Sequence, residues 1–244
     1  MRSLEYEKLN QVEDQMWWFR GLHENLVTIF HQRRPKRPHG VILDAGCGTG
    51  SLLRTLAQVL PEYTLLGLDA DNTACEIAHA KSGQFVCLGT ANSLPLSDAC
   101  LAAIFSADVL CHDGVDEKQA LQNFHRCLQP EGILVLNLPA YRWLLSGHDR
   151  AVHNVRRYTS HDIREALMAA GFVDVETTYW NTIFFPLMVL HRILFSKPDE
   201  SDVRLYARPV ETIFRTIMRL ETFMLSRGLN LPFGGSVIAT AIKK

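Results

Sequence analysis

The chain has 244 residues, of which 47% are hydrophobic and 21% charged, a composition typical of a globular protein with a sizeable core. Its 25 Lys and Arg residues nearly balance its 26 Asp and Glu residues, so no overall field attracts nucleic acid, and none is expected as a partner. The six cysteines are scattered, without a CxxC pair or a His/Cys cluster at zinc spacing. We therefore expect no metal site, and reduced core cysteines in a cytoplasmic protein.

The N-terminal part of the chain has a helical pattern. It covers residues 3–34, with a break predicted near Gly21, and leads into a basic, Pro-rich stretch at 33–40. The first twenty residues carry acidic side chains and no apolar run, so they do not resemble a signal peptide. We expect residues 1–39 to form a helical lid.

Short apolar runs that alternate with helical patterns follow this segment. Buried strands are predicted at 41–46, 64–71, 84–89, 101–110 and 133–139, and helices at 51–61, 72–83 and 116–132. Such alternation predicts a mostly parallel sheet with helices on both faces, whose ligands bind beyond the carboxyl ends of the strands. Those ends are predicted at Asp44, Asp69, Gly89, Asp108 and Asn137.

The C-terminal part adds a helix at 160–172 and two further strands, at 173–180 and 235–244. We therefore expect an α/β core over 40–180, closed by a seventh strand at 236–244. The segment between them, 181–235, has two apolar helical stretches around a polar 196–202. It could pack on the core, form a homodimer, cover a greasy substrate or touch a membrane surface peripherally; no stretch is long enough to span a bilayer.

The stretch "DAGCGTG" (44–50) follows the first strand and opens a helix. Gly46, Gly48 and Gly50 allow a sharp turn and close approach of a ligand to the main-chain amides. Ser51 stands where a dinucleotide-binding G-x-G-x-x-G loop needs its last glycine. The carboxylate of Asp44 would repel a pyrophosphate and suits a cationic ligand, which favours S-adenosylmethionine (SAM) over NAD.

As a set, "VILDAGCGTG" (41–50), "TANSLPL" (90–96) and "DVLCH" (108–112) resemble the motifs of class I SAM-dependent methyltransferases. "MWWFRG" (16–21) and the "HD…HNVRRYT" pattern of 148–159 are similar to one subgroup of these enzymes. The resemblance implies the Rossmann-like fold of that class: a seven-stranded, mostly parallel sheet with N-terminal helices and a helical insertion before the last strand.

The resemblance also implies which residues would bind SAM. Asp44 would lie near the methionine ammonium, Asp69 would accept hydrogen bonds from the ribose hydroxyls, and Asp108 would flank the methionine. Thr90 stands where related enzymes commonly have an aspartate for the adenine amino group. Further contacts are expected from the loop glycines and from lid and strand-end residues: Trp18, Arg20, Gly46, Gly48, Gly50, Ala70, Ala91 and Asn92. Arg20 is expected to pair with the methionine carboxylate, because an arginine amid tryptophans needs an anionic partner.

The stretch "GHDRAVHNVRRYT" (147–159) follows the fifth strand, on the edge where the donated methyl group should point. His148 and His153 are candidate general bases, and Asp149 could orient an imidazole. The other candidates would hold the acceptor: Tyr158 as a hydrogen-bond donor, with His112, Tyr141, Arg156 and Arg157. Alternatively, Arg156, Arg157 and Tyr158 only pack this loop and pair with local carboxylates.

The sequence thus predicts methyl transfer from SAM to an oxygen or carbon of a small, apolar or anionic metabolite, free or carrier-bound, with S-adenosylhomocysteine as the other product. Two alternatives remain: a SAM-binding scaffold without catalysis, which the threonine at 90 keeps open, and a nucleotide-cofactor oxidoreductase, which Ser51 disfavours.

Overall fold

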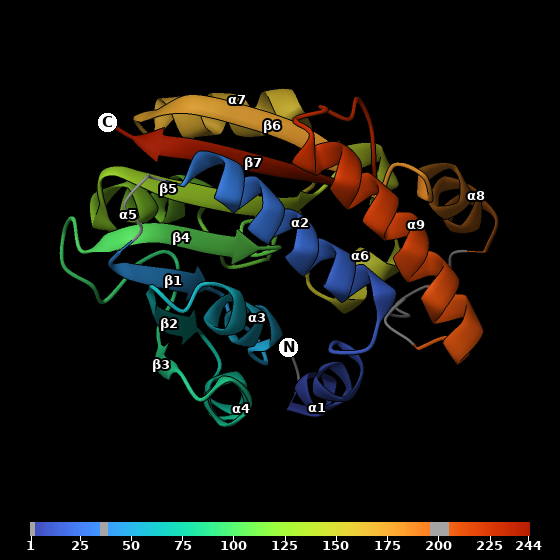
Figure 1. Cartoon of the computed structure of the whole chain (residues 1–244), viewed down its shortest axis with the longest axis horizontal. Coiled ribbons are helices and arrows are strands. Elements are labelled where there is room, and N and C mark those ends of the chain that lie inside the picture. The colour runs from blue at the N-terminus through green and yellow to red at the C-terminus, as the bar shows by residue number, and fades with distance from the viewer. Residues whose placement is uncertain (1–2, 35–38, 196–204) are drawn as a thin grey trace.

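The computed structural model describes residues 3–34, 39–195 and 205–244, and within them it forms one seven-stranded sheet (Figure 1). The strand order is β3-β2-β1-β4-β5-β7-β6. The strands are β1 (Val41–Ala45), β2 (Thr64–Asp69), β3 (Phe85–Leu88), β4 (Leu101–Ala107), β5 (Leu128–Pro139), β6 (Phe172–Trp180) and β7 (Ser236–Lys243). The five strands from β1 to β5 are parallel, and β7 pairs antiparallel to both β5 and β6. The predicted Rossmann-like α/β fold is confirmed.

Two apolar layers hold helices against the two faces of the sheet. On one face lie α2 (Trp17–Arg33), α3 (Ser51–Val59) and α9 (Arg208–Ser226), which share a core with the side chains of β1, β4 and β5 (Figure 1). On the other face α5 (Glu117–Cys127) and α7 (Ser160–Ala169) pack on the alternate residues of the same strands. Both faces are therefore covered, as the continuous apolar runs of the strands require.

The N-terminal helices differ in one respect from the prediction. The break lies between α1 (Ser3–Val12) and α2 rather than at Gly21, which is buried inside α2. A Cβ atom at residue 21 would lie 3.3 Å from the Cβ of Met218, so the glycine brings α2 and α9 close together. The glycine here indicates helix packing rather than a break.

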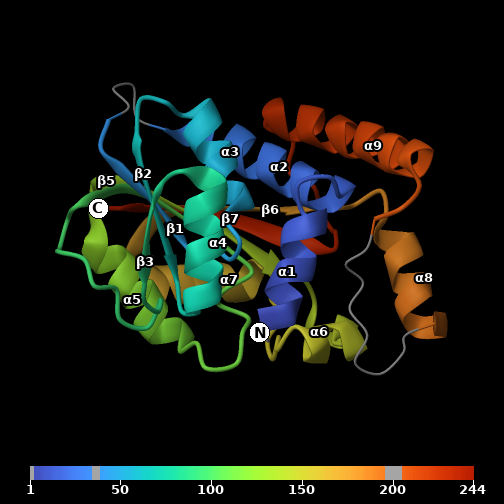
Figure 2. The same ribbon diagram turned by 90° about the horizontal axis from the view of Figure 1, so that it is seen from below.

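α4 (Asn72–Ser82) packs on β2 and β3 beside α3, and α1 lies against α4 (Figure 2). The 3-10 helix η1 (Arg142–Leu144) and the short α6 (Gly147–Ala151) follow β5, and α8 (Phe185–Phe195) follows β6. The predicted polar stretch at 196–202 lies outside the described residues. None of the described helices is long and apolar enough to cross a membrane.

Candidate active site

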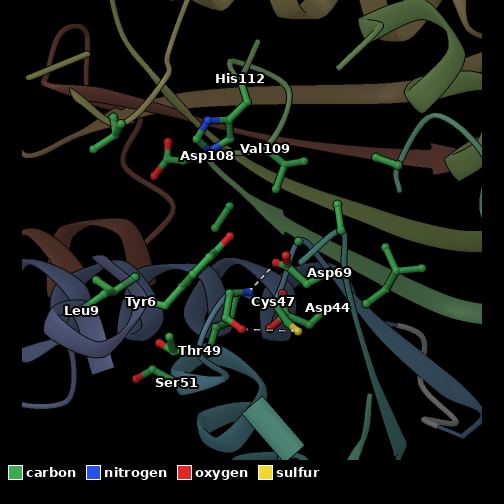
Figure 3. Close-up of a pocket in the computed structure, with 18 of the residues that line it drawn as sticks. Tyr6, Leu9, Asp44, Cys47, Thr49, Ser51, Asp69, Asp108, Val109 and His112 are labelled. Carbon is green, nitrogen blue, oxygen red and sulfur yellow. Dashed lines mark hydrogen bonds between the residues drawn. The ribbon is translucent and has the colours of Figure 1, made fainter. Parts of the chain in front are cut away.

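A cavity of about 530 Å³ lies at the carboxyl ends of the parallel strands. Its walls come from β1, β2 and β4, the segment after β3, the helices α1 and α2, and the loops around His112 and His153. In Figure 3, Asp108 and His112 lie on one side of the cavity and Asp44, Asp69 and Thr49 on the other, with Tyr6 projecting between them. This is the place where parallel α/β sheets bind their ligands.

The loop after β1 folds back over β2 and forms the floor of the cavity. The amides of Gly46 and Cys47 both donate to the carbonyl of Leu68, at 2.7 and 2.9 Å. Gly46 has a φ of +81°, and a Cβ atom there would lie 2.2 Å from a methyl carbon of Val109. Gly48, with a φ of +52°, has no atom within 4 Å of the place a Cβ would take. The loop thus needs glycine at residue 46 and leaves room for a ligand at residue 48.

Gly50 has a different role from the other two loop glycines. It is not among the residues that line the cavity, and a Cβ atom there would lie 2.7 Å from the Cα of Ala78 in α4. Its contribution is to let α3 pack closely on α4.

Asp44 is the most unusual carboxyl group of the cavity. Its side chain is buried, and its Oδ2 atom has no hydrogen-bond partner among the described residues. Burial, with the nearby charges of Asp69 and Glu13, raises the pKa of Asp44 to about 8. A buried carboxylate with one oxygen unpaired is unfavourable, so this position calls for a cationic or hydrogen-donating ligand.

The other two predicted aspartates also line the cavity. The carboxylate of Asp69 accepts from the amides of Gly48 and Asp71, at 2.9 and 3.0 Å, which orients it at the end of β2. Asp108 has a φ of +56°, and both of its oxygens accept from Nδ2 of Asn137 at 3.0 Å. Burial raises the pKa of Asp108 to about 7, against the opposing effect of the Asn137 hydrogen bond.

The charges that line the cavity fit a cationic cofactor. Among its described lining residues, the carboxyl groups are Glu13, Asp44, Asp69, Asp108 and Asp113, and none is lysine or arginine. Such a lining disfavours a pyrophosphate and suits the ammonium and sulfonium charges of SAM. The unpaired oxygen of Asp44 and the open space at Gly48 are where its amino-acid end would be held.

The N-terminal segment supplies three cavity residues that the predicted lid over 1–39 did not include by name. Tyr6, Leu9 and Glu13 all line the cavity. Glu13 is hydrogen-bonded to Thr49 of the glycine loop and paired with Lys81 of α4, and the adjacent Asp14 accepts from Ser51 at 2.7 Å. The i, i+3, i+7 spacing of Tyr6, Leu9 and Glu13 indicates that they share one side of a helical pattern. No sequence pattern near these residues indicates a contact with Lys81.

The predicted lid residues Trp18 and Arg20 are placed differently. Trp18 lines the cavity, with its ring 5.4 Å from that of Trp180 between centroids. Arg20 is not on the cavity, and its Nε donates to the carbonyl of Asp14 at 2.7 Å. Its guanidinium therefore ties α2 to the α1–α2 turn and is not directed at the cofactor position.

Two of the three candidate histidines beyond Asp108 line the cavity. They are His112 and His153, the latter with a φ of +60°. Burial lowers the pKa of His112, which favours the neutral imidazole that a general base needs. The backbone of His148 lies in α6, and its side chain lies outside the described residues.

Asp149 and Arg157 form a buried ion pair away from the cavity lining. Arg157 Nη2 lies 2.8 Å from Asp149 Oδ1, and the carboxylate also accepts from the amide and hydroxyl of Ser146. These contacts lower the pKa of Asp149 despite its burial, with Arg157 as the main opposing charge. Arg157 also donates to the carbonyl of Ala140 at 2.9 Å. Both groups thus fix the loop after β5.

The three other predicted acceptor-binding residues are engaged in the same loop. Arg156 donates to the carbonyls of Leu110, His112 and Val115. The hydroxyl of Tyr158 donates to the carbonyl of Leu110 at 3.0 Å. Tyr141 stacks on Tyr179 with ring centroids 5.3 Å apart. The structure brings none of them to the cavity lining, and Arg156 instead shapes the loop that carries His112.

Of the two residues predicted to bind the cofactor after β3, Ala91 and Asn92, only Ala91 lines the cavity. Thr90, beside it, and Ala70, which follows β2, line the cavity as well. Asn92 is turned away: its Nδ2 donates to the carbonyl of Gly114 and its Oδ1 accepts from the amide of Asp116. Thr90, in the position of the expected aspartate, lines the cavity, and its hydroxyl accepts from the amide of Asn92 at 3.2 Å.

Comparison with known proteins agrees with this geometry. Residues 43–136 match the family model described as "Methyltransferase domain". The chain is 30% identical over 149 residues to trans-aconitate 2-methyltransferase of Deinococcus radiodurans. This match covers 59% of this chain and 52% of that protein. It is 28% identical over 162 residues to malonyl-[acyl-carrier protein] O-methyltransferase of Herminiimonas arsenicoxydans, covering 64% and 61%. The match thus spans about half to three-fifths of these curated relatives.

Solved structures show the same fold over nearly the whole chain. A SAM-dependent methyltransferase of Thermotoga maritima, described as a possible histamine N-methyltransferase, has a TM-score of 0.59 at 22% identity, covering 98% of this chain and 95% of that one. Phosphoethanolamine N-methyltransferase 2 of Haemonchus contortus, solved in complex with SAM, has a TM-score of 0.60 at 15% identity, covering 89% and 52%.

The glycine loop and the three strand-end carboxyl groups lie in or beside the part of the chain that the family model matches, on the fold that these enzymes share. Residues 43–136 therefore carry a methyltransferase domain, on a fold that the chain shares with solved SAM-dependent methyltransferases.

Proposed function

We propose that the protein transfers a methyl group from SAM to a small molecule bound in the same cavity. The observation that carries this proposal is the combination of an open glycine loop with a lining that has five carboxyl groups and, among the described residues, no lysine or arginine. A cofactor with two positive charges gains most from such a lining, and related chains of this fold use SAM.

The residues of this chain divide the binding of the cofactor between them. The buried carboxyl group of Asp44 and the backbone around Gly48 would hold the amino-acid end, and Asp69 would accept from the ribose hydroxyls. Ala70, Thr90 and Ala91 would surround the base, and Trp18 and Tyr6 would exclude water from the other side. When bound, SAM supplies an electrophilic methyl group on a positively charged sulfur.

The acceptor side of the cavity lies beside Asp108, His112 and His153. If the acceptor is a hydroxyl or an acidic carbon, an imidazole within reach accepts its proton, and neutral His112 is suited to that task. The neighbouring wall is apolar, with Phe19, Val115 and Val152. We infer an oxygen or carbon acceptor on a largely apolar molecule whose anionic groups, where present, lie outside the cavity, because Arg156 and Arg157 are engaged elsewhere.

Labelled methyl transfer tests this function. The purified protein is incubated with methyl-labelled SAM and a small-molecule extract, and labelled products are identified by mass spectrometry. The proposal expects a labelled small molecule that forms much more slowly with Asp44→Asn protein when SAM is limiting. Tight SAM binding without any labelled product would instead favour a scaffold without catalysis, and NAD that displaces SAM would favour a nucleotide-cofactor enzyme.

A further inference from the structure

The outer side of α9 exposes large apolar side chains. Ile213, Leu220 and Phe223 are 57%, 54% and 53% exposed. At 100° per residue these three positions lie within about 80° around the helix, so they form one stripe. The opposite side of α9 is buried through Met218 and Leu225 in the core shared with α2. Figure 2 shows α9 as the outermost helix on this side of the molecule, lying over α2. The stripe is thus a surface feature and not an incompletely packed core.

The charges of α9 are sorted between its two sides. Both of its carboxylates are used inward: Glu211 accepts from the amide of Trp17 at 2.8 Å, and the buried Glu221 accepts from the amide of Ile183 at 2.7 Å. The exposed charged residues of α9 and its C-terminal cap are arginines, Arg208, Arg219 and Arg227. The guanidinium carbon of Arg227 lies 4.7 Å from the centre of the Phe223 ring.

From this arrangement we propose that the outer face of α9 docks, parallel to the surface, on a membrane that contains anionic lipids. An apolar stripe flanked by arginines fits the boundary between acyl chains and anionic headgroups. A second copy of the chain fits less well, because facing α9 helices would bring their arginines together while both carboxylates of each helix stay turned inward. The helix cannot span the bilayer, so it lies on it.

Docking through α9 would also bring the membrane near the N-terminal end of α2, which forms part of the cavity wall. The ring of Trp17 contacts Phe214 of α9, with centroids 5.4 Å apart, while the adjacent Trp18 lines the cavity. The start of α2 therefore links the docked helix to the wall of the candidate active site. The membrane inference itself rests on α9 alone and does not depend on the proposed methyl transfer.

Vesicle binding tests the proposal. The full chain is mixed with vesicles of phosphatidylcholine alone or with added phosphatidylglycerol, and the bound fraction is measured by flotation. We expect binding to the mixed vesicles only, reduced by added salt. The double variant Leu220→Ser/Phe223→Ser should bind at least about tenfold more weakly. Arg219→Gln and Arg227→Gln should each cost about fivefold.

A matched control comes from the opposite face of the sheet. Met168 of α7 is 60% exposed, and Met168→Ser removes a comparable apolar side chain there, so it should bind vesicles like the unchanged protein. Thermal unfolding of every variant checks that each one folds. Equal binding to both kinds of vesicle, no binding at all, or full binding by the double variant would overturn the proposal. So would a dimer in sedimentation velocity that the double variant converts to a monomer.

Discussion

At the scale of single residues, the candidate site is defined by two buried carboxyl groups, Asp44 and Asp108, whose pKa values are raised. The pKa of Asp44 is raised to about 8 by burial and by the charges of Asp69 and Glu13, and that of Asp108 to about 7 by burial. A cation bound beside them would favour their ionised forms. The binding energy of such a ligand and the protonation of these two groups are therefore coupled.

Replacing Asp44 with asparagine tests that coupling most simply. The amide keeps the shape of the side chain and removes its charge, so we expect the affinity for SAM to fall about tenfold to a hundredfold, the usual range for a lost charged hydrogen bond. Isothermal titration calorimetry measures the change. Asp98→Asn, which removes an exposed carboxylate outside the cavity, should leave the affinity unchanged; an equal loss in both variants would contradict the assignment.

The raised pKa values also predict a pH dependence. Below its pKa of about 8, Asp44 is mainly protonated in the free protein, and binding of a cation must release that proton. The affinity for SAM should therefore rise from about pH 6 to about pH 7.5, a window below the usual pKa of an α-ammonium group. Titrations in buffers of different ionisation enthalpy should show proton release. A SAM affinity that does not change with pH over this window would count against proton release from Asp44. The same would follow if the affinity of Asp44→Asn protein rose with pH as steeply as that of the unchanged protein.

The two cavity histidines are the candidates for proton transfer. His112→Ala or His153→Ala should lower kcat about a hundredfold or more if that side chain is the base, while SAM affinity changes little. His161→Ala is the control, because His161 is exposed on α7. If both cavity variants keep full turnover with a bound acceptor, catalysis reduces to positioning of the two reactants.

At the scale of elements, the loop between β5 and α7 is organised by the pair of Asp149 and Arg157 and not by contact with a ligand. The ion pair is buried, and Arg192 of α8 lies 3.5 Å from the same carboxylate. Removing one partner leaves the other charge buried and unpaired. The loop therefore depends on this pair for its fold.

Asp149→Asn should accordingly destabilise the protein by about 3–5 kcal/mol, measured as the free energy of unfolding in denaturant. Asp174→Asn removes a carboxylate from a pair in which Asp174 is exposed, and should cost no more than about 1 kcal/mol. Loss of turnover in Asp149→Asn protein with unchanged stability would instead assign Asp149 to the reaction.

The N-terminal helix is held over the cavity by a few polar contacts. Lys81 pairs with the buried Glu13, and burial raises the pKa of Glu13 against the opposing effect of Lys81. Lys81→Met removes that partner, so we expect α1 to detach more often and SAM to dissociate about tenfold faster in stopped-flow experiments. Lys118→Met, at an exposed position of α5, should change nothing. Equal dissociation rates in all three proteins would show that α1 is not a lid.

The positions of the strands along the chain and the carboxylates at their ends could be predicted because both are local patterns. The apolar runs indicate the strands, and parallel topology then brings Asp44, Asp69 and Asp108 to one edge. The sequence predicts a helical lid over 1–39 but not the contacts that hold it over the cavity, since Glu13 and Lys81 are 68 residues apart. The sequence also could not distinguish a structural ion pair of Asp149 and Arg157 from a catalytic pair, because the same residue types occur in both. Only the position of Asp149 and Arg157 away from the cavity lining identifies the pair as structural.

At the scale of the whole molecule, the core places two features on the same N-terminal half of α2. Its Trp18 closes the cavity, and its Trp17 packs on α9, whose outer face carries the apolar stripe. A largely apolar acceptor and an apolar, arginine-flanked helix are consistent with each other, although they are tested by separate experiments.

The account rests on the claim that the acidic cavity at the strand ends holds SAM. A crystal structure of the protein with S-adenosylhomocysteine tests this most directly. We predict the amino-acid end of the ligand beside Asp44 and the backbone of Gly48, with the ribose hydroxyls on Asp69. A ligand that occupies another part of the molecule, or a cavity that stays empty at saturating concentration, would contradict the claim.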